Sequence, residues 1–440
     1  MNRRLIATLI SLSFAASAGV AQATDLLQAY RAAVAHDAQF AVARATVVAG
    51  REKYDQGQSA LLPQVNAFGS LTHSDVDRTV GNTTTTTAGE TTKYGVSLVQ
   101  PLYRWQNWVS YQQGELQSAQ AEATFAQAQQ DLILRVAEAY FNVLNAQESL
   151  KATQSQKTAF AQQLELAKKT FEVGTATITD THEAQARYDL VTAQEFAAQN
   201  TLEVARQSLA VVIGKEAGDL AVLKPGGVIS GPQPADMKSW VDQAEKNNVA
   251  VRVQAISAEI ASKTSESARA GHQPTLDFKA SYGHEKNTAG GSATTPDKTT
   301  AVSYGLELNL PLFAGGATQS RSREAAAQRD AALAGLDGSR RQATLAARQG
   351  YLGVTNGLAQ VKALEAAEVS SQSALEATKV GYEVGVRINN DVLNAEQQLY
   401  ATKRDLYKAR LDTLLAHLRL KAAVGAVAED DLRQVNGLLN

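Results

Sequence analysis

The sequence predicts a membrane β-barrel joined to a long all-α coiled-coil tunnel, with each chain supplying four strands to the barrel. Three observations lead to this fold class: an internal duplication of the chain, short alternating strands in each half, and helical stretches far longer than those of ordinary globular domains. Together they indicate one subunit of an assembly that crosses a membrane.

The N-terminus has the features of a secretory signal peptide. Arg3 and Arg4 precede the uncharged apolar stretch 5–20, and Ala21-Gln22-Ala23 is a small-x-small cleavage site. We therefore assign residues 1–23 to the signal peptide. A retained membrane anchor is the alternative, but the stretch is short and no stop-transfer segment follows it. No later segment approaches about 18 uninterrupted apolar residues, so we expect the mature chain to enter a membrane through β-strands.

The composition excludes several classes of function. The formal charge of the 440-residue chain is only −2, so we expect no nucleic acid partner. The chain has no cysteine, which excludes disulfides and thiolate chemistry. The six histidines are scattered without metal-ligand spacing, and phosphate-binding loops and hydrolase motifs are absent. We therefore predict neither an enzyme nor a cofactor or metal site.

A duplication organises the whole mature chain. The segment 171–174, Phe-Glu-Val-Gly, reappears at 382–385 as Tyr-Glu-Val-Gly, which is a shift of 385 − 174 = 211 residues. The same shift relates Pro63 to Pro274, Tyr140 to Tyr351, Asn145 to Asn356, Asp180 to Asp391 and Gly214 to Gly425. We divide the chain into a first repeat, 24–223, a Pro/Gly-rich linker, 224–235, and a second repeat, 236–440.

Each repeat predicts the same order of elements: a helix, two strands, a very long helix and a returning helix. Pro63 and Pro274 end the first helices because proline disfavours the helical conformation of the preceding residue. Gly174 and Gly385 end the long helices, since glycine tolerates the left-handed conformation of a helix C-terminus. The predicted helices are about 25–59, 105–172 and 180–213, then 237–270, 318–383 and 390–424, and the predicted strands are about 63–72, 93–101, 274–284 and 302–311.

The strands alternate apolar and polar residues. In 302–310, every second side chain is apolar (Val302, Tyr304, Leu306, Leu308, Leu310), and the side chains between them are small or polar. A soluble hairpin would show the same alternation, but the Thr-rich segment 73–92 and the Gly- and Thr-rich segment 285–300 favour a barrel with outward-facing surface loops. Four strands cannot close a barrel, and open strand edges are not tolerated in lipid. A dimer would provide eight strands with little lumen, whereas a trimer would provide twelve.

The long helices predict a tubular wall. Ile133, Val136, Tyr140 and Val143 are spaced by three and four residues, as in a coiled-coil seam, and the second repeat has the same phase from Tyr351. A helix of about 66 residues spans on the order of 100 Å, which would cross much of a periplasm.

Two junction motifs and two helix turns extend the pattern. Each second strand ends in Pro-Leu-aromatic (101–103 and 311–313), and the turns contain Val173-Gly174-Thr175 and Val384-Gly385-Val386. With these motifs, the mature chain resembles the TolC family of outer membrane factors over essentially its whole length. The resemblance implies a trimer with a twelve-stranded barrel and a twelve-helix periplasmic tunnel. It also implies an adaptor protein that contacts the helix tips, an inner-membrane transporter of the RND, ABC or MFS type, and export of drugs or unfolded polypeptides.

The resemblance also implies roles for residues near the turns. Asp180, Tyr382 and Arg387 match the family's links that close the tunnel end, where a carboxylate can accept hydrogen bonds from a hydroxyl and a guanidinium. Asp391 matches an acidic entrance ring, and a ring of like charges should favour cations. The second ring position is an acid in the founding member but Asn394 here, while the repeat-related position, 394 − 211 = 183, is Glu183. Glu183 either compensates for Asn394 or serves only as an acid in a helix's first turn.

Two other classes of protein fit parts of the pattern. A trimeric coiled-coil surface adhesin would have a barrel and a stalk, but not this duplication. A structural protein that spans the periplasm would need only the helices. Within export ducts, drug efflux and type I protein secretion use the same parts, and the sequence does not separate them.

Overall fold

The structure is a computed structural model that describes residues 23–224, 226–289 and 297–439. The predicted signal peptide therefore lies, except for its last residue, outside the described residues. The chain folds as two compact units, and each unit contains parts of both repeats. Of the described residues, the first unit comprises 23–43, 126–224, 226–248 and 341–439, and the second comprises 44–125, 249–289 and 297–340.

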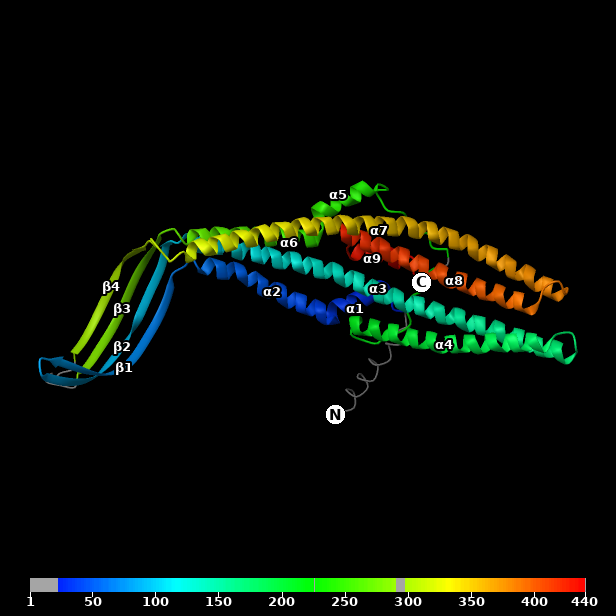
Figure 1. Cartoon of the computed structure of the whole chain (residues 1–440), viewed down its shortest axis with the longest axis horizontal. Helices are drawn as coiled ribbons and strands as arrows, with labels where there is room; N and C mark the ends of the chain where they lie inside the picture. The colour runs from blue at the N-terminus through cyan, green and yellow to red at the C-terminus, as the bar shows by residue number, and fades with distance from the viewer. Residues whose placement is uncertain (1–22, 225, 290–296, 440) are drawn as a thin grey trace, which may run out of the picture. The chain divides into compact units, whose positions relative to one another are not determined.

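The second unit contains a four-stranded antiparallel sheet in the order β1-β2-β3-β4 (Figure 1). The two repeats meet where β2 pairs with β3, for example at Val96 opposite Tyr282. Within the described residues of one chain, β1 and β4 each have one unpaired edge. The strands are β1 (Gln64–Val80), β2 (Thr83–Tyr103), β3 (Thr275–Ala289) and β4 (Asp297–Asn309).

The strands are longer than predicted, and most of the predicted loop 73–92 is a hairpin. β1 and β2 pair along their whole length around a tight turn at Gly81, whose φ of 64° is the left-handed conformation that glycine adopts freely. The interpretation as a loop was wrong because a run of threonines, though polar, is β-branched and favours extended backbone. In the second repeat, strand pairing likewise continues beyond the predicted boundary, and residues 290–296 lie outside the described part.

The first helix of each repeat is interrupted, whereas the sequence predicted it to be continuous. The interruptions lie at Asp37 and Asn248, which are related by the 211-residue shift and have extended ψ values of 122° and 128°. Asp37 begins the next helix by accepting a hydrogen bond of 2.6 Å from the Phe40 N–H, a cap that competes with continuous helix. The resulting helices are α1 (Leu26–His36), α2 (Ala38–Ser59), α5 (Met237–Asn247) and α6 (Val249–Ala270).

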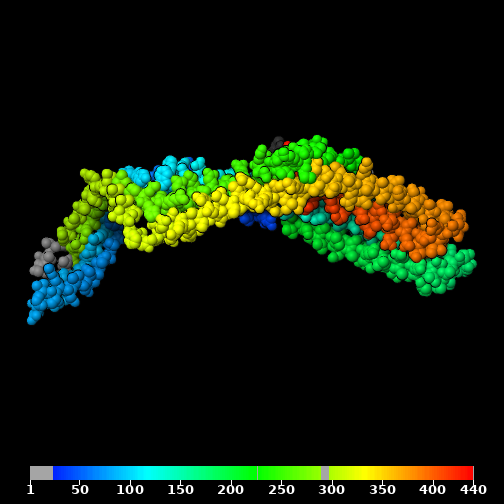
Figure 2. Space-filling model, turned by 45° about the horizontal axis from the view of Figure 1, so that its top comes forward, coloured from blue at the N-terminus to red at the C-terminus, as the bar shows by residue number. Residues whose placement is uncertain are grey.

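Two helical hairpins dominate the first unit. Each long helix ends at a left-handed glycine, Gly174 with a φ of 78° and Gly385 with a φ of 79°, as the repeat predicted. Their tips lie side by side in Figures 1 and 2, coloured green and orange. The helices are α3 (Trp105–Glu172), α4 (Ile178–Ile213), α7 (Ala317–Glu383) and α8 (Asn389–Ala423), followed by a short α9 (Glu429–Asn436).

Apolar side chains hold the two hairpins together. Leu393 of α8 is fully buried in a cluster with Phe160 of α3 and with Ala184 and Val191 of α4. The predicted seam of α3 is also confirmed, because Val136, Tyr140 and Val143 are fully buried. Among the described residues, no helix has the length and apolarity needed to cross a lipid bilayer.

Candidate functional site

The two helix tips are built by the same backbone contacts. The Thr175 N–H donates a hydrogen bond of 2.9 Å to the Thr170 carbonyl, and the Val386 N–H donates one of 2.8 Å to the Gly381 carbonyl. These pairs are equivalent under the duplication. Val173, Val384 and Val386 are exposed at the tips. The predicted contact stretches therefore lie on the surface of turns closed by backbone hydrogen bonds.

Asp180 forms hydrogen bonds with Thr177 at the first helix tip. Its Oδ2 atom accepts hydrogen bonds from the N–H of Thr177 (2.9 Å) and from its hydroxyl group (2.8 Å). The Asp180 N–H in turn donates to the Thr177 hydroxyl oxygen at 3.3 Å, which completes a capping box at the start of α4. At the start of α8, Asp391 accepts a long bond of 3.4 Å from the Ile388 N–H, and the Ile388 side chain has no oxygen atom to accept the reciprocal bond.

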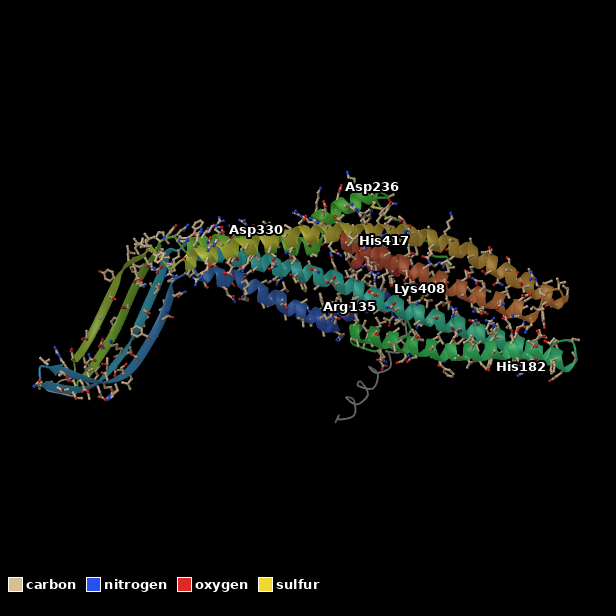
Figure 3. All side chains as sticks on the ribbon, viewed as in Figure 1. Arg135, His182, Asp236, Asp330, Lys408 and His417 are labelled. Atoms are coloured by element: carbon tan, nitrogen blue, oxygen red, sulfur yellow. The ribbon has the colours of Figure 1, made fainter. Side chains whose placement is uncertain are left out.

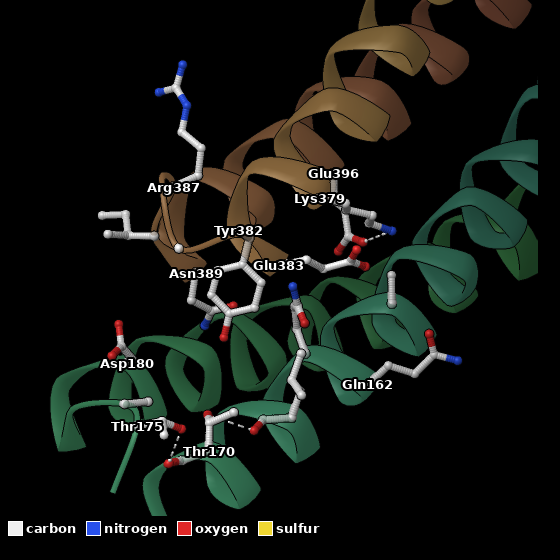
Figure 4. Close-up of a pocket in the computed structure, with 16 residues that line it drawn as sticks. Gln162, Thr170, Thr175, Asp180, Lys379, Tyr382, Glu383, Arg387, Asn389 and Glu396 are labelled. Carbon is white, nitrogen blue, oxygen red and sulfur yellow. Dashed lines mark hydrogen bonds and ion pairs between the residues drawn. The ribbon is translucent and has the colours of Figure 1, made fainter.

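A cavity of about 720 Å³ lies between the two hairpins (Figure 4). Its wall includes Asp180 from the first repeat and Tyr382 and Arg387 from the second, so the structure brings the three predicted gate residues around one space. They do not bond to one another in the described chain. Arg387 forms a loose ion pair of 3.7 Å with Asp391 and, in Figure 4, extends away from Asp180.

The same cavity has a buried charge that the sequence analysis missed. Lys379 of α7 and Glu396 of α8 form an ion pair of 2.8 Å, and Glu396 is only 3% exposed. Its Oε2 atom, and both polar side-chain atoms of the equally buried Asn389, have no hydrogen-bond partner among the described protein groups. The sequence offered no signal for the pair, since the two residues lie on different helices on either side of a turn.

The predicted ring residues on α8 contact two different arginines. Asp391 pairs with Arg387, whereas the Asn394 Oδ1 accepts a hydrogen bond of 2.8 Å from Arg187 of α4. Glu183 is half-buried one turn before Arg187 on the same helix face. Arg187 is a second residue that the sequence analysis missed, although its spacing of seven residues from Asp180 places both on one side of α4.

The histidine nearest the turn, His182, is exposed near the tip of α4 (Figure 3). In the part of the chain that the structure describes, no three His, Cys, Asp or Glu side chains are grouped so as to hold a metal ion.

The strand pairs, the long hairpins and the polar cavity between their tips define the class of outer-membrane export channels. The sequence profile of the family described as "Outer membrane efflux protein" matches the chain twice, at 29–215 and 240–426. The two matches are themselves shifted by 240 − 29 = 211 residues, which confirms the duplication. The chain belongs to this family, and it is an outer-membrane exit duct that extends into the periplasm.

Known relatives and solved structures match this chain over nearly its whole length. The chain is 32% identical to Outer membrane protein TolC of Vibrio cholerae over 435 residues, covering 99% of this chain and 98% of that protein. It is 32% identical to Proteases secretion protein PrtF of Dickeya chrysanthemi over 446 residues, covering 99% and 95%. The Campylobacter jejuni CmeC outer membrane channel has the same fold, with a TM-score of 0.80 over 94% of this chain and 90% of that chain at 16% identity.

Proposed function

We propose that three copies of the chain form one duct, with a twelve-stranded barrel continuous with a twelve-helix tunnel. The supporting observation is the incomplete sheet of the single chain. Both outer edges lack a partner strand, and the alternating apolar residues of β4 are exposed, Val302 and Leu306 by more than half. Edges and apolar rows of this kind need neighbouring strands and lipid to cover them. Outer membrane lipid is therefore the partner of this face.

The trimer is tested by native mass spectrometry of protein extracted from outer membranes. We expect three times the mass of the 46.8 kDa chain less its signal peptide, 1–23. N-terminal sequencing of the same sample checks that the mature chain begins near Thr24. A monomer in the soluble periplasmic fraction would refute the duct and favour a structural periplasm-spanning protein. An intact trimer with surface adhesion but no transport would favour the adhesin.

Asp180, Tyr382 and Arg387 then form a gate at the tunnel end. Both local bonds of Asp180 use Oδ2, so its Oδ1 remains available to a hydroxyl or guanidinium donor. Arg387 has an exposed side chain, and its ion pair with Asp391, four residues along the chain, is loose at 3.7 Å, which leaves it free to move to such an acceptor. Exposed links of this type are individually worth about 0.2–1 kcal/mol, which suits a gate that a bound partner can open.

The packing of the helices around the cavity also leaves buried polar atoms on Asn389 and Glu396 without partners among the described protein groups. Buried polar groups ordinarily have hydrogen-bond partners, so these atoms mark a part of the packing that a different arrangement of the helices would satisfy. This favours a tunnel end that can exchange between two arrangements. Asp391 and Glu183 supply the acidic charge near the entrance, beside the neutral Asn394.

The duct passively conducts drugs and other small molecules, or unfolded polypeptides, from an inner-membrane transporter of the RND, ABC or MFS type. A periplasmic adaptor docks on the exposed tip residues Val173, Val384 and Val386. One relative, PrtF, is named for protease secretion, which favours polypeptide export as the second candidate. Deletion of the gene, followed by assays of drug susceptibility and of secreted proteins, separates the two cargo classes.

A further inference from the structure

One arginine joins the two repeats at the tunnel end. The Arg187 side chain of α4 donates through Nη1 to the Gln397 Oε1 at 2.7 Å and through Nη2 to the Asn394 Oδ1 at 2.8 Å. Asn394 and Gln397 are three residues apart on α8, so their side chains lie on one face and match the spread of a guanidinium. The bridge therefore connects the returning helix of the first repeat to that of the second.

The bridge is separate from the predicted gate. Asp180 bonds to Thr177 and Arg387 pairs with Asp391, so none of these contacts shares a partner with Arg187. The gate contacts and the bridge therefore use different side chains.

The duplication does not reproduce the bridge. Under the 211-residue shift, Arg187 corresponds to Gln398, Asn394 to Glu183 and Gln397 to Ala186. A reciprocal bridge from α8 to α4 would need a long cationic donor at 398 and an acceptor at 186, and the chain has neither. The capping acids Asp180 and Asp391, by contrast, are kept in both repeats. The bridge is thus a feature of one helix pair and not a by-product of the internal symmetry.

The bridge lies beside the apolar contact between the same two helices. Leu393, adjacent to Asn394, is fully buried against Ala184 and Val191 of α4. Movement of α8 away from α4 would break the polar bridge and the apolar contact together. Both acceptors of Arg187 are neutral amides, whose bonds to a charged donor are weaker than those of carboxylates. Such a contact can be released without leaving a carboxylate unpaired.

We propose that Arg187 is a second tether of the tunnel end, which holds α8 against α4 and must release before the end opens. This inference rests on the proposed function, because it requires a tunnel that opens by separation of these helices. Arg187 acts as a positioning residue through Asn394 and Gln397. It makes the closed state of this chain depend on a contact outside the gate residues.

Conductance of the purified trimer in planar lipid bilayers tests the tether. Arg187→Leu removes both hydrogen bonds, and we expect the open fraction to rise roughly five-fold or more, the factor that corresponds to about 1 kcal/mol. The matched control is Arg206→Leu, which removes the same charge from α4 at a residue with no side-chain hydrogen bond or ion pair in the described chain. Asp180→Asn serves as the variant that opens the gate itself.

A strengthening variant distinguishes a tether from a simple charge effect. Asn394→Asp supplies a carboxylate acceptor, so it should lower the open fraction while Arg187 is present and have no such effect in the Arg187→Leu background. An effect of the added carboxylate on ion selectivity should persist in both backgrounds. Equal open fractions for Arg187→Leu and Arg206→Leu, in a trimer that Asp180→Asn opens, would overturn the proposal and leave the duct intact.

Crosslinking provides a readout that does not depend on conductance. The chain has no cysteine, so Arg187→Cys combined with Asn394→Cys gives one defined pair per chain. We expect a short bis-maleimide to join the pair in cells and to stop export, while Arg206→Cys with Asn394→Cys remains unjoined. Crosslinking in a protein that forms no channel would refute the proposed function and with it the tether, while a crosslinked channel that exports as well as the uncrosslinked one would refute the tether alone.

Discussion

The hydroxyl group of Tyr351 donates a hydrogen bond of 2.7 Å to the carbonyl oxygen of Ala235. The first repeat contains the equivalent bond, in which the Tyr140 hydroxyl donates to the Thr24 carbonyl at 3.0 Å across the same separation of 116 residues. Both bonds tie the residue at the start of a repeat, or directly before it, to the middle of the long helix of that repeat. The duplication is therefore preserved in side-chain contacts as well as in element order.

The two tyrosines should differ in their contribution to stability. Tyr140 is fully buried and also donates to the Ala221 carbonyl at 2.8 Å, whereas Tyr351 is half-buried with one acceptor. Tyr140→Phe removes the donor from buried carbonyls, so we expect a loss of about 1–3 kcal/mol in the free energy of unfolding. Tyr351→Phe should cost less than about 1 kcal/mol. Denaturant unfolding of the purified protein checks the order, and equal losses would contradict it.

The ion pair at the cavity predicts an asymmetric response to mutation. Lys379→Ala leaves the 3%-exposed Glu396 carboxylate unpaired. We expect a loss of about 2 kcal/mol in stability, less than the 3–5 kcal/mol typical of a fully buried pair because Lys379 is half-exposed. Lys408→Ala, which breaks the exposed pair with Asp412 on the same helix, is the control and should cost under about 1 kcal/mol. The midpoints of thermal unfolding provide the comparison, and the replacement of both Lys379 and Glu396 by Met should restore most of the loss.

Substitutions that remove the charge of Asp180 or Arg387 should open the proposed gate. Asp180→Asn weakens an acceptor for Tyr382 or Arg387, and Arg387→Ser removes a donor, so each should raise single-channel conductance and sensitise cells to large antibiotics. Because salt screens exposed charges, a higher salt concentration should also weaken these contacts and favour the open state of the wild-type channel. Asp189→Asn, an exposed acid further along α4, is the control. A wild-type channel that is already fully open would show that these residues do not close it.

The entrance charge depends on whether Glu183 replaces the missing acid at 394. We expect Asp391→Asn to reduce the preference for cations, and Glu183→Gln to reduce it further if the acid has moved between the repeats. The measurement is the reversal potential in a salt gradient across a bilayer. Unchanged selectivity and unchanged cation block in Glu183→Gln would assign this residue only to the first turn of α4, where an acid is favourable beside the helix dipole.

His417 predicts a pH dependence of stability. Burial, together with the positive charge of Lys421, lowers the pKa of His417 in the folded protein, while Asp431 opposes the shift. The unfolded chain therefore binds this proton first, so stability should fall as the pH decreases below the ordinary value of 6.5. His417→Gln should flatten the unfolding free energy between about pH 5 and 7. A slope that persists in the variant would assign the effect to other groups.

Strand boundaries mark the limit of pattern-based prediction. The four strands were found from their alternation, but their outer ends were missed because the threonines of 83–87 form extended ladder pairs although they resemble loop residues. The breaks at Asp37 and Asn248 were missed because neither is a Gly or Pro, and a short polar side chain ends a helix only when it finds a local N–H or a carbonyl to bond.

The sequence by itself determined what depends on neighbours along the chain: the duplication, the order of helices and strands, the turns at Gly174 and Gly385, and the family. Turn conformation and periodic burial are local properties, so they can be recognised from spacing alone. Only the tertiary structure decided which side chains meet across the repeats. It brought Asp180, Tyr382 and Arg387 around one cavity, and it placed Arg187 on Asn394, 207 residues away. Such contacts depend on how two separate helices pack, and no spacing within one helix specifies that.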